Sequence, residues 1–514
     1  MYSYSFANFY WWLADNPYLT TGTQFIDAKG IDIRNNAPTI RPQVWLTAWF
    51  ALTSTTKLYC AVDWFGFGDN WKVYWLPTGV EVYNAGSYNI KAVTKFNGMY
   101  IWWAEASGAI QVGKILVSET SWATTWVWQP SVDAAWHFAS DADWTGNDQN
   151  DTSCRIPIVK YGRKLFWANK NWVFVADTAN LVEVWLSNLE ADVMWLTNEW
   201  SRICVFLANW QKLFRDWGSE NIQEVKKYPF VIRHVYDAGD FSYVVAGTWV
   251  GDDQLFMSAG YDMKLLKDQS TNIFITRTES GSQNWFTSYN NITYFLGKSA
   301  TQWVAAESGM YMIYSHWSYN SSLPQSVNLE WYKTDNGNYL KQAYMLHEYA
   351  GVLYVCYYDL TATEYWIDKV TLQILQDNTK WGLSFTGGGS PADTYITPHI
   401  FDWGKGQRNI KKRLKKIEFV GNLTNAGWWV TIKYQKTDDL GQGARKYLLE
   451  YWYSTDTRAT LATIDNVDAT SRQRIVDTTI DIEFYSIIFK IIFTDTDASL
   501  TQFIIYYDEV ADVW

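Results

Sequence analysis

The sequence predicts an all-β protein, and three of its features carry that prediction. Apolar residues come mostly in short runs that often alternate with polar ones, and long helical periodicity is nearly absent. Aromatic residues make up 18% of the chain and are typical of strands. Asn, Asp, Gly, Ser and Thr separate the runs, as turn residues do. With 514 residues, 48% of them hydrophobic and 18% charged, the chain is too apolar for disorder and long enough for two or three domains.

The first 45 residues read as an extended arm that ends in a short strand. Their opening, MYSYSFANFYWW, has no basic segment and no cleavage pattern, so we do not expect a secretion signal. No apolar run of the chain approaches the roughly 20 residues that a membrane helix needs. We therefore expect a protein that is made in a cytoplasm and has no membrane partner.

The middle of the chain consists of similar hairpin units, each with two apolar strands around a short polar turn. They fall at 57–76, 92–117, 156–177, 202–216, 241–259, 290–314 and 349–372. Their spacing of roughly 40 to 60 residues is that of β-propeller blades, which bury their faces only against neighbouring blades. We expect a six- or seven-bladed β-propeller over 46–388. Two stacked β-sandwich domains built from the same hairpins remain the alternative.

A linker precedes the last part of the chain. The stretch FTGGGSPADTY at 385–395 holds three glycines and a proline, which a strand interior would not tolerate. After it come five or six segments with a period of two, as in Ile480, Ile482 and Phe484. This pattern predicts a C-terminal β-sandwich domain over 389–514.

Motifs that carry chemistry are scarce. The cysteines and histidines form no metal-binding spacing, no nucleophile motif and no disulfide framework. No phosphate-binding or dinucleotide-binding loop is present either. We therefore expect no catalytic residue, no cofactor and no metal, and a protein that is not an enzyme. The residues concerned are Cys60, Cys154, Cys204 and Cys356, and His137, His234, His316, His347 and His399.

Two acidic stretches keep an enzyme as an alternative. A propeller can bring two carboxylates together on its axis and hydrolyse glycosides with them, so a glycoside hydrolase or depolymerase has to be weighed. Both stretches are also rich in Asn, Gly and Thr, which is the composition of ordinary exposed turns. Their acidic residues are Asp141, Asp143, Asp148 and Asp151, and Asp252 and Asp253.

A basic run stands out against the net charge of −11. In one interpretation it is an exposed edge strand, whose lysines prevent pairing with other sheets. In the other it contacts an acidic partner protein or the DNA backbone. The run consists of Lys405, Arg408, Lys411, Lys412, Arg413, Lys415 and Lys416.

The 33 tryptophans outnumber the 31 glycines, whereas tryptophan is normally scarce and glycine common. Many tryptophans follow Asn or Asp between predicted strands, where hairpin turns call for glycine because the backbone takes φ > 0. We hypothesise that the gene comes from a genome that reads UGA as glycine, an alternative genetic code. A carbohydrate-binding propeller with an authentic tryptophan surface is the other interpretation. The pairs are Asn70-Trp71, Asn171-Trp172, Asn209-Trp210, Asn284-Trp285, Asp63-Trp64, Asp143-Trp144, Asp216-Trp217 and Asp402-Trp403.

Residues 10–42 form a distinctive pattern when they are read with glycine at Trp11 and Trp12. Its members are Leu13, Pro17, Ala28, Gly30, Ile31, Asp32, Ile33, Arg34, Arg41 and Pro42. This pattern resembles the opening of a family of tailed-bacteriophage virion proteins, the propeller-type tail-accessory and packaged-DNA-stabilisation proteins of the neck or tail nozzle. Segments 413–421 and 503–510 resemble the end of that family.

The resemblance implies a non-enzymatic structural component of a virion that is made in the host cytoplasm. It implies a ring-shaped homo-oligomer that contacts portal, neck or tail proteins and packaged DNA. It brings no catalytic residues. The residues expected at interfaces are Leu13, Pro17, Asp32, Arg34 and Arg41, together with the seven residues of the basic run.

Overall fold

The computed structural model contains strands and turns, and no α-helix within the residues that it describes. Those residues are 1–7, 25–29, 31–32, 41–42, 47–52, 56–69, 72–84, 89–106, 109–117, 126–130, 156–169, 171–178, 181–186, 188–199, 202–209, 211–216, 224–229, 231–239, 241–247, 254–259, 262–267, 273–274, 284, 286–289, 292–299, 307–314, 327–328, 341–359, 362–372, 394–398, 400–401, 410–422, 429–437, 459–465, 473–476, 480–493 and 499–510. The prediction of an all-β protein is confirmed.

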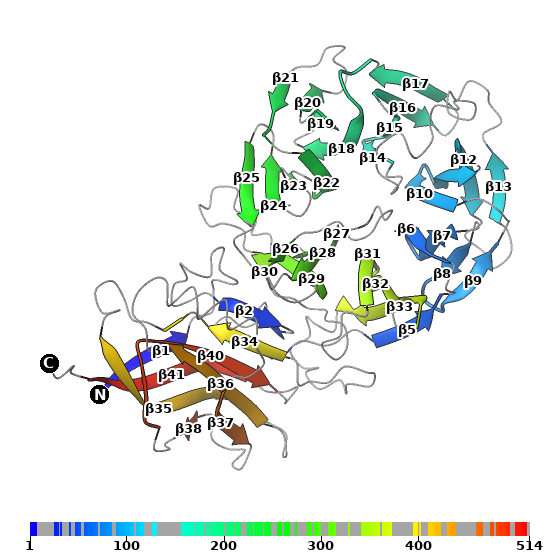
Figure 1. The fold of residues 1–514 in the computed structure, drawn as a ribbon. Coiled ribbons are helices and arrows are strands. Elements are labelled where there is room, and N and C mark those ends of the chain that lie inside the picture. The colour runs from blue at the N-terminus through cyan, green and yellow to red at the C-terminus, as the bar shows by residue number, and fades with distance from the viewer. Residues whose placement is uncertain are drawn as a thin grey trace.

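Seven antiparallel sheets, counted over the described residues, follow one another from residue 47 to 371 and lie in a ring (Figure 1). Six of them are made of strands that are consecutive in the chain. The first three are β6 (Leu58–Val62), β7 (Phe65–Gly68), β8 (Val73–Trp75) and β9 (Val80–Tyr83); β10 (Asn89–Phe96), β11 (Met99–Ala106), β12 (Ala109–Val117) and β13 (Trp126–Pro130); β14 (Ile158–Tyr161), β15 (Lys164–Asn169), β16 (Trp172–Thr178) and β17 (Leu181–Leu186).

The next three sheets continue the ring in the same way. They are β18 (Val193–Glu199), β19 (Arg202–Leu207), β20 (Gln211–Asp216) and β21 (Glu224–Lys227); β22 (Val231–Asp237), β23 (Ser242–Gly247), β24 (Gln254–Ala259) and β25 (Asp262–Lys267); β26 (Ile273–Phe274), β27 (Phe286–Tyr289), β28 (Ile292–Ser299), β29 (Glu307–Tyr314) and β30 (Val327–Asn328). All seven hairpins that the sequence predicts lie in these sheets or in the closing one.

The seventh sheet closes the ring with a strand from the other end of the segment. It joins β31 (Lys341–Tyr349), β32 (Val352–Asp359) and β33 (Glu364–Thr371) to β5 (Thr47–Ala51). The Leu52 amide continues this pairing by donating to the Tyr365 carbonyl at 2.7 Å. The first and last parts of the ring are thereby held together by strand pairing.

Hydrophobic clusters fill the space between neighbouring sheets of the ring. Phe65 and Phe67 of β7 pack in one cluster with Tyr100 of β11. Leu58 of β6 shares another cluster with Tyr354 of β32, across the closure. Each sheet therefore buries its faces against its neighbours, as blades do, and the arrangement is propeller-like rather than two stacked sandwiches.

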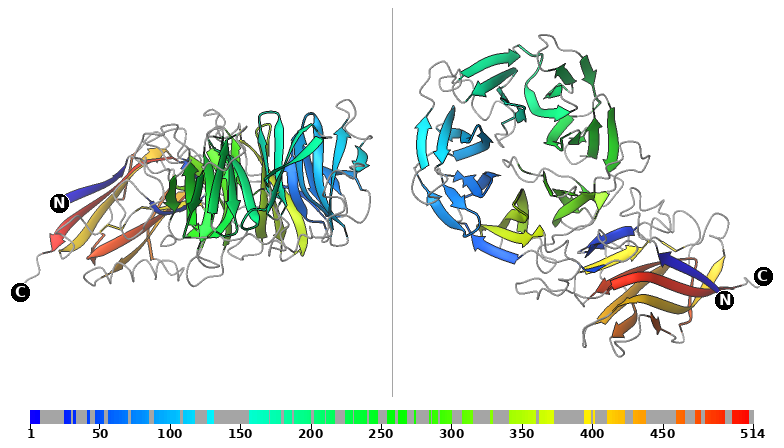
Figure 2. Two further views of the ribbon diagram at one scale, coloured as in Figure 1. Left: turned by 90° about the horizontal axis from the view of Figure 1, so that it is seen from above. Right: turned by 180° about the vertical axis from the view of Figure 1, so that it is seen from behind.

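A C-terminal unit of two five-stranded sheets lies beside the ring (Figures 1 and 2). One has the order β1-β41-β35-β38, with β39 also pairing with β35, and the other has the order β2-β34-β40-β36-β37. The strands are β1 (Tyr2–Ala7), β2 (Phe25–Lys29), β34 (Thr394–Pro398), β35 (Lys411–Asn422), β36 (Trp429–Thr437), β37 (Ala459–Asp465), β38 (Gln473–Val476), β39 (Ile482–Phe484), β40 (Ser486–Phe493) and β41 (Ser499–Val510).

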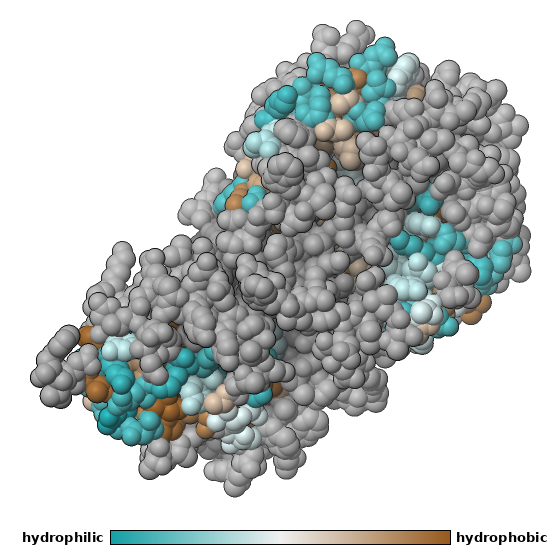
Figure 3. Space-filling view, viewed as in Figure 1, coloured by the Kyte–Doolittle hydropathy of each residue, from teal (hydrophilic) through white to brown (hydrophobic). Residues whose placement is uncertain are grey.

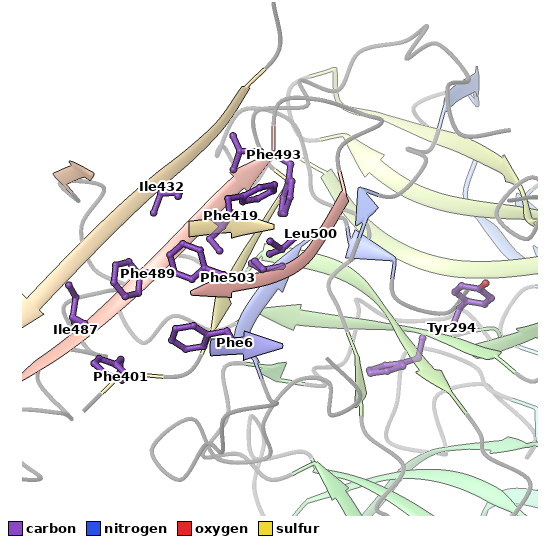
Figure 4. Close-up of a cluster of buried hydrophobic side chains, with 14 of the residues drawn as sticks. Phe6, Tyr294, Phe401, Phe419, Ile432, Ile487, Phe489, Phe493, Leu500 and Phe503 are labelled. Carbon is purple, nitrogen blue, oxygen red and sulfur yellow. The ribbon is translucent and has the colours of Figure 1, made fainter. Parts of the chain in front are cut away.

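The core of this unit is aliphatic and aromatic. Phe6 of β1 lies among Phe401, Phe489 and Phe503 in the close-up of Figure 4. The Phe6 and Phe503 ring centroids are 5.8 Å apart, and the Phe6 side chain is 1% exposed. The first strand of the chain is thus a core element of its last unit.

The described part of residues 1–45 differs from the expected arm. β1 pairs with β41, and β2 pairs with β34. The short strands β3 (Ile31–Asp32) and β4 (Arg41–Pro42) pair with each other. The physical reason is that β1, YSYSFA, alternates polar and aromatic residues and completes an otherwise open sheet edge. The division into 1–45, 46–388 and 389–514 stays a prediction.

Candidate interaction surfaces

The five described residues of the basic run lie on β35, an internal strand. β35 pairs with β41 on one side and with β38 and β39 on the other. The interpretation as an exposed edge strand is therefore wrong. The reason is visible in the sequence around the lysines, because Leu414, Ile417 and Phe419 are fully buried and draw the strand into the core.

Acidic residues of the same unit meet the cations at the start of β35. The Lys411 Nζ lies 2.6 Å from Glu483 Oε2, and Arg413 donates to Glu483 Oε1 and lies 3.1 Å from Asp481 Oδ1. These hydrogen bonds, from Lys411 first and then from Arg413, lower the pKa of Glu483 to about 2. Lys415 also faces Asp481, at 3.8 Å.

The two other basic residues of β35 are also engaged within the chain. Lys412 is 1% exposed, and its Nζ donates to the Ile410 carbonyl at 3.0 Å. The Lys416 Nζ lies 4.9 Å from the centre of the Tyr506 ring, within reach of a cation–π interaction. Three of the five described basic residues therefore face carboxylates of the same unit, and the other two contact a carbonyl oxygen or an aromatic ring. Figure 3 shows mainly hydrophilic residues over the described surface of this unit.

The remaining predicted interface residues divide into two groups. Asp32 and Arg41 are paired positions in the backbone register of β3 and β4. The others lie outside the described residues, as do all six aspartates of the two acidic stretches, Cys154 and three histidines. Those others are Leu13, Pro17, Arg34, Lys405 and Arg408.

A polar cluster that sequence reasoning missed lies at the hairpin turns of the ring. Asp63 Oδ2 accepts from the Tyr100 hydroxyl at 2.6 Å and from the Lys95 Nζ at 2.9 Å. His347 Nε2 lies 2.7 Å from the Asp63 carbonyl oxygen, and burial lowers the pKa of His347. The turn Asp63-Trp64 therefore links the sheets that contain β6, β10 and β31. The one local signal for it was an aspartate in a turn.

A second polar cluster is buried between two sheets of the ring. The Lys212 Nζ lies 2.6 Å from Glu199 Oε2 and 2.7 Å from the Ser258 hydroxyl, and both charged side chains are 0% exposed. Ser258 belongs to β24, so the pair joins the sheet of β18–β21 to that of β22–β25. Nothing in the sequence spacing marked it, because its members come from three strands that only the fold brings together.

Asp237 lies beside this cluster. Its carboxylate accepts from the Gly239 amide at 2.8 Å and from the Asn198 amide at 3.2 Å. Burial nevertheless outweighs these hydrogen bonds and raises the pKa of Asp237 to about 6.

The described cysteines are core residues. Cys60, Cys204 and Cys356 are buried, and burial raises the pKa of each thiol, as for small apolar residues of a core. Within the described ranges, no three His, Cys, Asp or Glu residues gather closely enough to hold a metal ion. No helix among the same residues is long and apolar enough to cross a membrane.

Comparison with known proteins gives similarity in fold only. No family model matches the chain, and no curated protein matches it. Among solved structures, the chain is similar to the WD40 β-propeller domain of Doa1, with 11% identity and a TM-score of 0.35, over 66% of this chain and 99% of that one.

Two other structures compare in the same way. The structure titled YCF48 bound to D1 peptide has 9% identity and a TM-score of 0.39, over 64% of this chain and 98% of that one. The Cps50 (Swd1) β-propeller domain from Myceliophteria thermophila has 9% identity and a TM-score of 0.38, over 63% and 100%. At such scores these likenesses carry no argument about function.

Proposed function

We propose that the chain is a non-enzymatic structural component of a tailed-phage virion, at the neck, the tail nozzle or another tail-accessory position. The resemblance of residues 10–42 to the opening of a family of phage virion proteins supports the virion assignment. The architecture supports a scaffold role, because a ring of sheets and a two-sheet unit form one chain, and β1 pairs with β41 within the second unit.

We propose further that the ring is a seven-bladed β-propeller closed by β5, and that the C-terminal unit is a β-sandwich. In such a closure the outermost strand of the last blade comes from the start of the propeller segment. The pairing of β5 with β33 is the observation that supports this count. Closure of this kind removes the free sheet edge that would otherwise remain between the first and last sheets.

The proposed partners are portal, neck or tail proteins and further copies of the chain in a ring, with packaged DNA as a further contact. The pairing of Lys411 and Arg413 with Glu483 favours protein partners over DNA, because cations that already have carboxylate partners release fewer counterions from a phosphate backbone.

Particle association tests the proposal. Particles are purified from a lysed culture of the natural host by density centrifugation, washed in high salt, and digested for mass spectrometry. We expect peptides of this chain in a constant ratio to the portal protein. If the chain remains in the soluble fraction while portal and capsid proteins sediment, the proposal is wrong. Portal, terminase and capsid genes beside this gene would support the proposal before any biochemistry.

A further inference from the structure

Two-residue loops recur at the equivalent hairpin of several sheets in the ring. In six of its sheets, one hairpin has two residues between the last paired residues of its strands. The pairs are Val62 with Phe65, Phe96 with Met99, Tyr161 with Lys164, Glu199 with Arg202, Tyr289 with Ile292, and Tyr349 with Val352. Positions within these loops are therefore equivalent from sheet to sheet.

Loops of this length favour turns with positive φ, because these match the twist of the flanking strands. Asn97 and Gly98 have φ of 48° and 77°, and Ala350 and Gly351 have φ of 52° and 80°. The first loop position has a positive φ in all four described loops, and the second has one at Gly98 and Gly351 but not at Arg163. Glycine adopts this conformation freely, whereas an L side chain rarely adopts it.

Trp64 occupies that second position in the loop Asp63-Trp64. Asp63 has a φ of 51°, as its counterparts Asn97 and Ala350 do. Trp64, in contrast, is not among the described non-glycine residues with positive φ. The loop keeps the length and register of its counterparts but lacks the positive φ that Gly98 and Gly351 have at the second position, as the loop of Gly162 and Arg163 also does.

Trp200 is a second tryptophan in one of these two-residue loops. It stands first between the paired residues Glu199 and Arg202. The equivalent position of the loop after Tyr161 is Gly162, with a φ of 57°. Trp64 therefore stands at the position of Gly98 and Gly351, and Trp200 at a position where every described counterpart has a positive φ, with glycine at 162.

We infer that the native protein carries glycine at positions 64 and 200, because its gene encodes them with UGA codons that its host reads as glycine. This inference concerns the covalent identity of the chain and does not depend on the proposed function.

An authentic Trp64 makes the opposite prediction. Its ring lies 4.7 Å from that of Tyr349 and 5.9 Å from that of Trp75. If these contacts were native, removing the indole would weaken the packing of β6 and β31 at this end of the ring.

Mass spectrometry of the protein from its natural source decides between the two. We expect the proteolytic peptides that span residues 64 and 200 to be lighter than the printed sequence requires, by the difference between the indole side chain and a hydrogen atom for each position. Peptides with the tryptophan mass, or UGG codons at both positions, overturn the inference.

Stability measurements test the conformational argument on the same chain. We expect Trp64→Gly to raise the urea midpoint, and the converse exchange Gly98→Trp at the equivalent position to lower it. A lower midpoint for Trp64→Gly would contradict the argument. Gly98 suits as the control because a Cβ added there meets no atom within 4 Å, so a loss would come from the backbone conformation rather than from crowding. Gly98→Ala isolates that strain should Gly98→Trp fail to fold.

Discussion

The ring and the C-terminal unit are both made of antiparallel strands, but they draw those strands from the chain in different ways. Six sheets of the ring use consecutive strands, and only β5 crosses a long sequence distance. The C-terminal unit places β1 beside β41, so that Ser5 and Gln502 are in contact although 497 positions separate them. Local pairing costs little loop-closure entropy, whereas the C-terminal unit can form only when distant segments meet.

This difference predicts that the stability of the C-terminal unit depends strongly on β1, a strand from the other end of the chain. Within the C-terminal unit, the largest effect is therefore expected from Phe6→Ala. Truncation of a buried Phe costs about 3 to 5 kcal/mol, and Phe6 is 1% exposed in the core of this unit.

Chemical denaturation with fluorescence and circular dichroism would measure this loss. Ser3→Ala is the matched control, because Ser3 lies on the same strand and is exposed, so its effect should stay within about 0.5 kcal/mol. Equal effects of the two changes would show that β1 does not contribute to the core.

The second prediction concerns the ring. Lys212→Met leaves the buried Glu199 carboxylate without its cation, at a cost of about 3 to 5 kcal/mol. Adding Glu199→Met should restore most of the loss, because two apolar side chains replace a buried ion pair at little cost. A double-mutant cycle by urea denaturation measures the coupling, and additive losses would contradict the pairing.

The third prediction is a pH dependence that belongs to the ring alone. The pKa of Asp237 is about 6 when folded, above its ordinary value of 3.8. The folded protein therefore holds this proton where the unfolded chain loses it. Its contribution to stability is full below about pH 4 and is lost as the pH rises through 6.

Asp237→Asn should remove this slope and stabilise the protein at pH 7 by about 3 kcal/mol, since the pKa difference is about two units and each unit corresponds to 1.36 kcal/mol. The amide oxygen can still accept from the Gly239 amide. Unfolding midpoints at pH 4 and pH 7 test this, and an unchanged slope in the variant would rule out Asp237 as its source.

The smallest effect is expected at the surface of the C-terminal unit. Arg413→Met removes one of the two donors to Glu483, so the pKa of Glu483 should rise from about 2 toward its ordinary 4.5. The lowered pKa contributes stability above about pH 4.5 that is lost as the pH falls toward 2. NMR titration of the Glu483 carboxylate checks the shift, and the unfolding midpoint at pH 7 should change little. A pKa that stays near 2 would assign the shift to Lys411 alone.

The same comparison explains what the sequence could predict. Hairpins such as 92–117 and 349–372 are local, so alternation and turn residues suffice to find them, and their strands appear in the structure. The role of β1 was not predictable in this way. Its pattern indicates a strand but not its partner. It pairs with β41 because Phe6 fits a core built from residues that lie almost 500 positions further along the chain.

The candidate sites show the same limit. The basic run was found from charge alone, yet its pairing with Asp481 and Glu483 depends on β39 lying beside β35. The Lys212–Glu199 pair gave no signal, and the Asp63 cluster gave only an aspartate in a turn, because their members are spread over several strands. Charge and turn composition predict where polar residues lie, and only the register of the sheets decides which of them meet.

Hydrogen exchange at the amides of β1 tests the central claim most directly. The claim is that the first strand is a structural member of the last unit. Tyr2 to Ala7 pair in register with Tyr507 to Gln502, so those β1 amides that bond to β41 should exchange as slowly as the amides of β41 and lose protection together with them in Phe6→Ala. Exchange of all β1 amides at the rate of an unstructured peptide, with β41 still protected, would contradict the account.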